Sequence, residues 1–495
     1  MDASQNLYVI LGVPPEATQD DIREAYRVAA RRFHPDANRN EGADHVFRDI
    51  ATAYEVLGNP LNRAEYDNAR RKFQDEPAYF TLRVTPSKRV LNMLEEPQVL
   101  YLLLEIVSMR GAAQQKRQSA RLNLTLVLDR STSMKGARLE RVKFAAQQII
   151  EQLTPEDVLS VVTFSDRSDV LIPASTVTDK LALRAMVNMM QADGGTEIFH
   201  GLSAGVEQCK RHLGTRMVNH IILLTDGRTF GDEQRCLELA NTAAADGISI
   251  SAMGIGDEWN DAFLDDLASR TGGSTTYINA PSAVVKFLNE RVRALGDAYA
   301  ERLHLTIAPD ADVKLESVFR LSPNPQALDI TREPVPLGTL EANKTALVLI
   351  QLQMPPGHKV GFRTVARLDV TGDILSFGRL GYKVLSDLSV EISESPPPEE
   401  PPLAVLDALG KLTLYRMQQK AEQSISKGNL VDGTRQLENL ATRLLASGHE
   451  ELAQMAMVEA RRVSNTQSLS EEGRKSLKYG TRMLLALPVP GGEET

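Results

Sequence analysis

The sequence predicts a multidomain protein with an N-terminal all-α domain, a β-sandwich interrupted by an α/β domain, and a C-terminal α-helical bundle. Three observations lead to this fold class. Apolar side chains recur at helical spacing near both ends of the chain, apolar strands alternate with amphipathic helices between residues 121 and 295, and β-type runs stand on either side of that alternation. A chain of 495 residues is long enough for roughly three or four such domains.

The composition is that of an ordinary soluble protein with an acidic balance. A formal net charge of -9 disfavours general nucleic-acid binding, which usually needs a basic surface. Cys209 and Cys236 are the only cysteines, so we expect neither a disulfide framework nor a cysteine-rich zinc centre. The sequence has no apolar run of membrane length and no secretory pattern, which predicts a cytoplasmic protein with no membrane span.

Residues 5–72 form the predicted N-terminal helical domain. Thr18 and Asp21 have the spacing of a capping box at the start of one helix. Proline disfavours helical backbone in the residue before it, so this helix ends near His34, and His34-Pro35-Asp36 lies at the tip of an antiparallel helical hairpin. The same helix has a basic stripe on one outer face, a pattern that is also typical of a plain solvated surface. The stripe consists of Arg23, Arg27 and Arg31.

The surroundings of this tripeptide closely resemble the J-domain of Hsp40 co-chaperones. The resembling segments, besides His34-Pro35-Asp36, are Tyr8 with Leu11-Gly12-Val13, Ala25-Tyr26-Arg27, Ala53-Tyr54-Glu55-Val56-Leu57 and Arg63-Ala64-Glu65-Tyr66-Asp67. The resemblance implies that the tripeptide and the basic stripe bind an Hsp70 chaperone and stimulate its ATPase. Val28 and Ala37 stand where many members of that family have lysine, so we expect a weaker basic patch. Beyond residue 73 the resemblance to general Hsp40 proteins ends.

Two separate regions are predicted to form β-strands. Residues 79–110 contain too few strands to be stable alone. Residues 300–394 contain a larger set of strands with turn residues between them. We therefore expect the strands of 79–110 to pair with the later ones in one β-sandwich, with the α/β domain inserted between the two parts.

The most regular strand of the α/β domain runs from Leu122 to Leu128 and is followed by Asp129-Arg130-Ser131-Thr132-Ser133. Parallel sheets bind ligands at the carboxyl ends of their strands. One carboxylate and two hydroxyls at alternate positions can point at one ion, and such hard oxygens suit Mg²⁺, with Mn²⁺ as the alternative. Taken alone, this stretch is more often an Asx-turn or a helix N-cap.

Two later stretches favour the metal site: Gly194-Gly195-Thr196-Glu197, and an apolar strand that ends in Thr225-Asp226-Gly227. In this order, the three stretches give residues 121–295 a strong resemblance to the von Willebrand factor A domain, a Rossmann-like α/β fold. The resemblance implies a metal-ion-dependent adhesion site that binds an acidic residue of a partner protein. Its ligands would be Asp129, Ser131, Ser133, Thr196 and Asp226.

The last region begins after a stiff, proline-rich linker at residues 396–402. Residues 403–488 show helical periodicity, and breaks at Gly428-Asn429, Gly448 and Asn465 predict three or four helices in a bundle. The role of these helices is not indicated by any motif.

The leading functional hypothesis is an adaptor that binds a partner through the metal site and stimulates an Hsp70 through the N-terminal domain. The sequence contains no metalloprotease pattern, nucleophile elbow or P-loop, so we expect no enzyme. The alternative is an assembly scaffold that works with an AAA+ ATPase in a multiprotein complex. A third hypothesis, given low weight, is a metal hydrolase that uses Asp129, Ser131 and Asp226.

Overall fold

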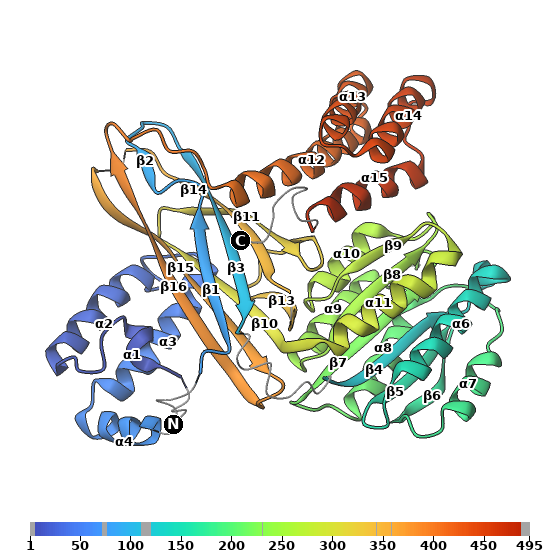
Figure 1. The fold of residues 1–495 in the computed structure, drawn as a ribbon, viewed down its shortest axis with the longest axis horizontal. Coiled ribbons are helices and arrows are strands. Elements are labelled where there is room, and N and C mark those ends of the chain that lie inside the picture. Colours follow the sequence, from blue (N-terminus) through green and yellow to red (C-terminus); the bar gives the residue numbers. More distant parts are fainter. Residues whose placement is uncertain are drawn as a thin grey trace. The chain divides into compact units, whose positions relative to one another are not determined.

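The computed structural model describes residues 5–71, 77–109, 120–229, 231–342, 344–357 and 359–486. The predicted domain ends at residues 72, 110 and 488 lie outside the described residues. The chain divides into two compact units. One unit contains the N-terminal helices and most of the β-sandwich, and the other contains the α/β domain and most of the C-terminal helices (Figure 1).

The N-terminal domain is a small helical domain, as predicted. Both halves of the capping box form, because Thr18 N donates to Asp21 Oδ2 at 2.8 Å and Asp21 N donates to Thr18 Oγ1 at 3.2 Å. The longer helices pair through a core that includes Ile22, Phe33 and Ile50, all at most 1% exposed. The helices are α1 (Leu7–Leu11), α2 (Gln19–Phe33), α3 (Glu41–Leu57) and α4 (Pro60–Arg70).

The sandwich is built from strands that lie on both sides of the α/β domain in the sequence. Strand β3 (Gln98–Ser108) pairs antiparallel with β1 (Phe80–Pro86) and with β14 (Ala346–Met354). The predicted interrupted sandwich is therefore present. Its two sheets have the orders β1-β3-β14-β11-β12 and β13-β10-β15-β16-β2. The remaining strands are β2 (Val90–Asn92), β10 (Ala298–Pro309), β11 (Lys314–Ser322), β12 (Gln326–Leu328), β13 (Val335–Glu341), β15 (Gly361–Ile374) and β16 (Arg379–Ser393).

The N-terminal domain packs directly on the sandwich within the same unit. Arg32 Nε donates to Asp310 Oδ1 at 2.5 Å, and Asn38, 2% exposed, donates to the carbonyl oxygen of Pro309 at 2.9 Å. Gly42 lies against the strand backbone so closely that a Cβ at this position would lie 1.8 Å from the carbonyl oxygen of Ile307. Only glycine allows α3 and β10 to approach to this extent.

The α/β domain has a six-stranded sheet in the order β6-β5-β4-β7-β8-β9. All neighbouring strands are parallel except β5 and β6, which are antiparallel. The edge strand β6 was not predicted, because its apolar residues Val170, Leu171 and Ile172 stand in one short run that Pro173 interrupts, without the alternation that indicates a strand. The strands are β4 (Arg121–Asp129), β5 (Val158–Phe164), β6 (Ser168–Thr176), β7 (Met217–Thr225), β8 (Ser249–Ile255) and β9 (Thr275–Ile278).

Helices of the α/β domain follow the predicted alternation, with one addition at its end. The helix α11 (Val284–Gly296) was not predicted. The other helices are η2 (Thr132–Met134), α6 (Ala137–Gln152), α7 (Lys180–Asn188), α8 (Ile198–Lys210), α9 (Glu233–Ala245), α10 (Asp261–Ser269) and η3 (Pro281–Ala283).

The C-terminal region is helical, as predicted, with consecutive helices that turn back on one another (Figure 1). They are α12 (Leu403–Ser426), α13 (Leu430–Ala446), α14 (Glu450–Thr466) and α15 (Glu471–Leu484). The break predicted at Asn465 falls two residues later, because Gln467 adopts the left-handed conformation that ends α14. Within the described ranges, no helix has the length and apolar character needed to cross a membrane.

Candidate functional site

The predicted metal loops lie at the carboxyl edge of the sheet of the α/β domain. Asp129 is the last residue of the central strand β4 and is fully buried. Its Oδ1 accepts a hydrogen bond from Ser131 N at 2.8 Å, and its Oδ2 accepts one from Thr225 Oγ1 at 2.7 Å. Burial raises the pKa of Asp129 to about 6, while the hydrogen bonds from Ser131 and Thr225 oppose that rise. A cation beside this carboxylate would favour its charged form.

Hydroxyl groups connect the first predicted loop to the carboxylate after β7. The Oγ atoms of Ser131 and Ser133 lie 3.0 Å apart, and Ser133 Oγ donates to Asp226 Oδ1 at 2.6 Å. Asp226 is 1% exposed, whereas Ser133 is exposed. The structure therefore brings these three predicted ligands into direct contact at one point of the sheet edge.

Thr196 belongs to a loop that is tied to the first one by backbone contacts. The carbonyl oxygen of Gly194 accepts hydrogen bonds from Thr132 N at 3.0 Å and from Thr132 Oγ1 at 2.9 Å. Thr196 Oγ1 would lie 3.1 Å from a Cβ at Gly227, the residue that follows Asp226. The hydroxyl of Thr196 is thus placed beside the third loop.

The donor set fits a hard divalent cation. It combines two buried carboxylates with hydroxyls, which are the oxygen ligands that Mg²⁺ and Mn²⁺ take in proteins. Among the described residues, no group of three or more histidine, cysteine, aspartate or glutamate side chains could hold a metal. The predicted site differs from such groups because it depends on hydroxyls.

Arg138 is a residue of this site that the sequence analysis missed. It lies in the first turn of α6, and its Nη1 is 2.6 Å from Asp226 Oδ2. The same nitrogen lies 3.3 Å from the carbonyl oxygen of Ser133. Arg138 and Asp226 are 88 residues apart in the sequence. No local sequence pattern around an arginine in the first turn of a helix indicates such a contact.

The N-terminal tripeptide forms a turn at the end of α2. His34 is the C-cap of that helix, and its carbonyl oxygen accepts hydrogen bonds from Ala37 N at 2.9 Å and Asn38 N at 2.8 Å. The ring of His34 packs edge-on against Phe47 at 5.1 Å between centroids. The side chains of His34 and Asp36 are 47% and 94% exposed, so a partner can reach both.

The predicted basic stripe is also exposed. Arg23 and Arg27 pair with acids of their own helix, at 3.2 Å from Asp20 and 3.5 Å from Glu24. Such exposed pairs contribute little and are easily exchanged for other partners. Arg31 is exposed as well. All three arginines are thus exposed on α2, the helix that ends at the tripeptide.

Comparison with known proteins identifies the two domains that carry these sites. The sequence matches the DnaJ domain family over residues 6–67 and the von Willebrand factor type A domain family over residues 123–291. The chain joins a DnaJ domain to a von Willebrand factor type A domain. The C-terminal helices match the family described as Sll0103-like, C-terminal alpha-helical domain, over residues 403–487.

Individual relatives match different parts of the chain. The uncharacterized protein sll0103 of Synechocystis is 29% identical over 386 residues, which are 75% of this chain and 90% of that protein. The chaperone protein DnaJ of Dictyoglomus thermophilum is 49% identical over 67 residues, which are 14% of this chain and only 17% of that protein. The likeness to DnaJ is therefore a likeness to its J-domain.

Two solved structures resemble most of the chain. A von Willebrand factor type A protein from Catenulispora acidiphila has a TM-score of 0.66 and 18% identity, and covers 83% of this chain and 98% of its own. The ArnB paralog VWA2 from Sulfolobus acidocaldarius has a TM-score of 0.52 and 15% identity, and covers 83% of this chain and 100% of its own. At these identities the likeness shows the fold alone.

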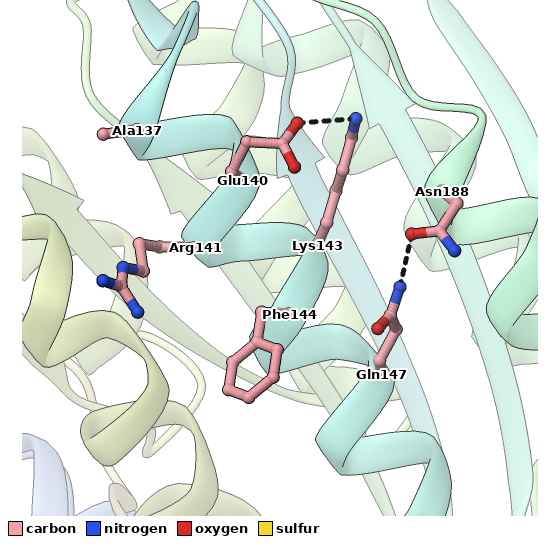
Figure 2. Close-up of a pocket in the computed structure, with 7 residues that line it drawn as sticks. All are labelled: Ala137, Glu140, Arg141, Lys143, Phe144, Gln147 and Asn188. Carbon is pink, nitrogen blue, oxygen red and sulfur yellow. Dashed lines mark hydrogen bonds and ion pairs between the residues drawn. The ribbon is translucent and has the colours of Figure 1, made fainter.

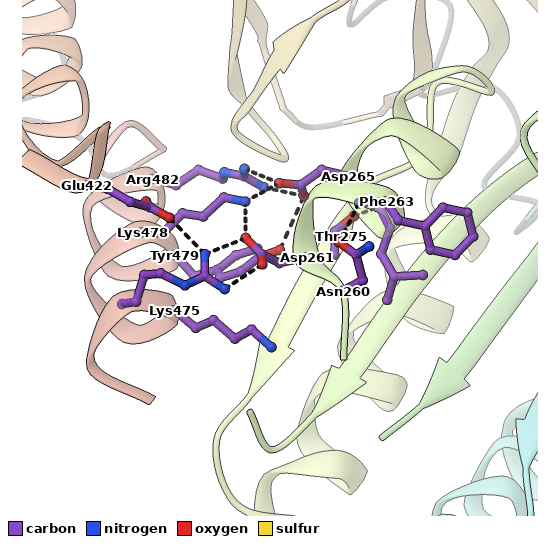
Figure 3. Close-up of polar contacts among 12 residues, drawn as sticks. Asn260, Asp261, Phe263, Asp265, Thr275, Glu422, Lys475, Lys478, Tyr479 and Arg482 are labelled. Carbon is purple, nitrogen blue, oxygen red and sulfur yellow. Dashed lines mark hydrogen bonds and ion pairs between the residues drawn. The ribbon is translucent and has the colours of Figure 1, made fainter. Parts of the chain in front are cut away.

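The A domain is joined to the C-terminal helices by a charged interface around α10 and α15 (Figure 3). Arg474 Nη2 lies 2.7 Å from Asp261 Oδ1, and Arg482 makes a two-pronged contact with Asp265 at 2.8 and 2.6 Å. Lys478 pairs with both aspartates. Burial raises the pKa of Asp261. The hydrogen bonds and positive charges of Arg474 and Lys478 lower it by a larger amount, so its pKa lies well below the usual range.

Lys475 of α15 contacts the loop that precedes α10. This side chain is fully buried and donates to the carbonyl oxygens of Asp257 at 2.6 Å and Trp259 at 2.5 Å. Its ammonium lies 4.3 Å from the centroid of the Trp259 ring. The loop before α10 therefore contacts α15 through its backbone, and Asp261, the first residue of α10, contacts α15 through its side chain.

A shallow hollow of about 440 Å³ lies on the outer side of α6 (Figure 2). Polar side chains on its wall already pair with one another: Lys143 donates to Glu140 at 2.9 Å, and Gln147 donates to Asn188 at 2.5 Å. The aromatic ring of Phe144 is half-exposed there. None of the five predicted metal ligands lines this hollow.

Proposed function

We propose that the protein is an adaptor of an Hsp70-type chaperone. Its J-domain would stimulate the ATPase of the Hsp70, and its A domain would bind a partner protein through a metal-ion-dependent site. The protein would then bring that partner to the chaperone. The two buried thiols, Cys209 and Cys236, are compatible with the reducing cytoplasm that we propose as the location.

The observation that carries the chaperone role is the exposure of the tripeptide while the J-domain is packed on the sandwich. Asn38, only two residues after Asp36, is held by the sandwich through the carbonyl oxygen of Pro309. Asp36 itself remains 94% exposed. The sandwich therefore holds the J-domain by a surface other than the tripeptide, which supports direct access for an Hsp70.

The metal site supports partner binding in the proposed function. Asp129, Ser131, Ser133, Thr196 and Asp226 would hold Mg²⁺, or Mn²⁺ in its place. The bound ion would supply a Lewis-acidic position for an acidic side chain of the partner. Ser133 is exposed at this position, and Ser131 and Asp226 lie beneath it, so the chain offers one open side to a ligand. We propose binding, with no enzymatic reaction.

The test of the chaperone role is the steady-state ATPase rate of the Hsp70 from the same organism, with and without the full chain. His34→Gln should abolish the stimulation, because the exposed ring of the tripeptide is lost. His45→Gln, which changes a histidine elsewhere in the J-domain, should stimulate like the wild type. Equal stimulation by His34→Gln and the wild type would contradict the proposal.

A further inference from the structure

Asp226, a predicted metal ligand, is already part of an ion pair in this structure. Its Oδ1 accepts from Ser133 Oγ at 2.6 Å, and its Oδ2 lies 2.6 Å from Arg138 Nη1. The carboxylate is fully buried, while the arginine side chain is 34% exposed. Since a buried carboxylate without a partner is costly, Arg138 supplies the positive charge that this carboxylate needs.

The position of Arg138 is defined on two sides. Its Nη1 lies 3.3 Å from the carbonyl oxygen of Ser133, in the first metal loop. Its Nη2 is so near the loop after β8 that a Cβ at Gly256 would lie 3.3 Å from it. The guanidinium therefore fills the space between the first metal loop and the loop that begins at Gly256.

The loop at Gly256 is itself firmly held. Trp259 Nε1 donates to the carbonyl oxygen of Gly256 at 2.7 Å, and Arg228 Nε donates to that of Glu258 at 2.9 Å. Lys475 of the C-terminal helices donates to two further carbonyl oxygens of this loop. The wall against which Arg138 packs is thus fixed by contacts within this unit.

We infer that Arg138 is a built-in competitor of the metal ion for Asp226, and that it sets the metal affinity of the site. This inference rests on the metal site of the proposed function. A divalent ion and a guanidinium are both cations, and Asp226 Oδ2 faces only one of them at a time. Metal binding therefore breaks the Arg138–Asp226 pair and leaves the guanidinium at a partly exposed position beside the ion.

The test is titration of the metal-free full chain with Mg²⁺ and with Mn²⁺ by calorimetry. Arg138→Gln should bind either ion tighter than the wild type by about tenfold or more, since one charge-assisted hydrogen bond no longer has to be broken. Arg138→Lys keeps the positive charge but lacks the planar guanidinium. Its metal affinity should lie between those of the wild type and Arg138→Gln. Arg141→Gln, one turn further along the exposed side of α6, is the matched control and should bind like the wild type.

Thermal unfolding gives a second readout on the same proteins. Without metal, Arg138→Gln should unfold at a lower temperature than the wild type, because Asp226 lacks its cation. Saturating Mg²⁺ should raise the unfolding temperature of Arg138→Gln more than that of the wild type. Equal or weaker metal binding by Arg138→Gln and Arg138→Lys, with folded proteins in both cases, would overturn the inference.

Asp129→Ala separates this inference from the proposed site. If the wild type binds metal and Asp129→Ala does not, the site is the predicted one, and the Arg138 variants alone decide the inference. If only Arg138→Gln binds, the competition is strong and the inference is supported. If Asp129→Ala binds like the wild type, or if neither the wild type nor Arg138→Gln binds metal, the proposed site fails and the inference fails with it.

Discussion

Arg31 and Arg32 are consecutive residues near the end of α2, yet they have different surroundings. Arg32 pairs with two aspartates of the sandwich, with its Nε 2.5 Å from Asp310 Oδ1 and its Nη1 3.3 Å from Asp387 Oδ1. Arg31 is exposed, and no ion pair of Arg31 is present among the residues that the structure describes. One arginine holds the J-domain in place, and the other is free to meet a partner.

This difference predicts that Arg31→Ala affects Hsp70 stimulation and that Arg32→Ala affects stability. Arg31→Ala should slow Hsp70 ATPase stimulation, most clearly at low salt, because it removes a charge that speeds encounter with the partner. It should leave the unfolding temperature near that of the wild type. Arg32→Ala should lower the free energy of unfolding of this unit by about 1–3 kcal/mol, because partly buried charge-assisted hydrogen bonds are lost. ATPase assays and calorimetric unfolding on both variants are the measurements. A destabilised Arg31→Ala, or an Arg32→Ala protein as stable as the wild type, would contradict these roles of the two arginines.

The second prediction concerns the interface between the A domain and the C-terminal helices. Lys475→Met should weaken this interface by about 2–4 kcal/mol, because one buried and one partly buried carbonyl oxygen lose their donor. Limited proteolysis should then release the C-terminal helices faster than from the wild type. Lys427→Met, at an exposed position after α12, is the control and should be cut like the wild type. Unchanged proteolysis of Lys475→Met would show that the charged pairs around Asp261 and Asp265 suffice.

The third prediction concerns Glu333 beside strand β10. Burial raises the pKa of Glu333 to about 8, and the hydrogen bond from Ile307 N only partly offsets this effect. The folded protein therefore favours the protonated acid. The contribution of Glu333 to stability is complete below its ordinary pKa of 4.5 and is lost as the pH rises through about 8.

Glu333→Gln should remove this pH dependence, because the amide stays neutral. Urea unfolding of the wild type should show a loss of about 3 kcal/mol between about pH 5.5 and about pH 8.5, relative to Glu333→Gln. Glu400→Gln, at an exposed position of the proline-rich linker, should follow the wild type. Parallel pH profiles for the wild type and Glu333→Gln would contradict the assignment.

Much of the fold follows from local sequence patterns. The capping box at Thr18, the proline after His34 and the apolar strand before Asp129 each act through neighbouring residues, so the elements that they define are predictable from a short stretch. The edge strand β6 is different, because it pairs with β5 on one side only and its short apolar run before Pro173 lacks the alternation that indicates a strand.

The contacts made by charged side chains were the least predictable part. Arg138 and Arg32 both look like ordinary exposed helix residues in the sequence, and both pair with aspartates far along the chain. Asp261, the first residue of α10, pairs with Arg474 and Lys478, more than 200 residues later. The spacing of charged residues in a sequence does not indicate which distant residue each will pair with. Such contacts can therefore be identified only from the folded structure.

The most direct test of the adaptor is capture of proteins from a lysate of the same organism on the immobilised full chain. The chain would be compared in Mg²⁺ and in EDTA, with Asp129→Ala, checked for folding by circular dichroism, as the matched control. The account predicts a set of proteins, identified by mass spectrometry, that only the wild type retains and only in Mg²⁺. The same retained set under all conditions would contradict metal-dependent partner binding.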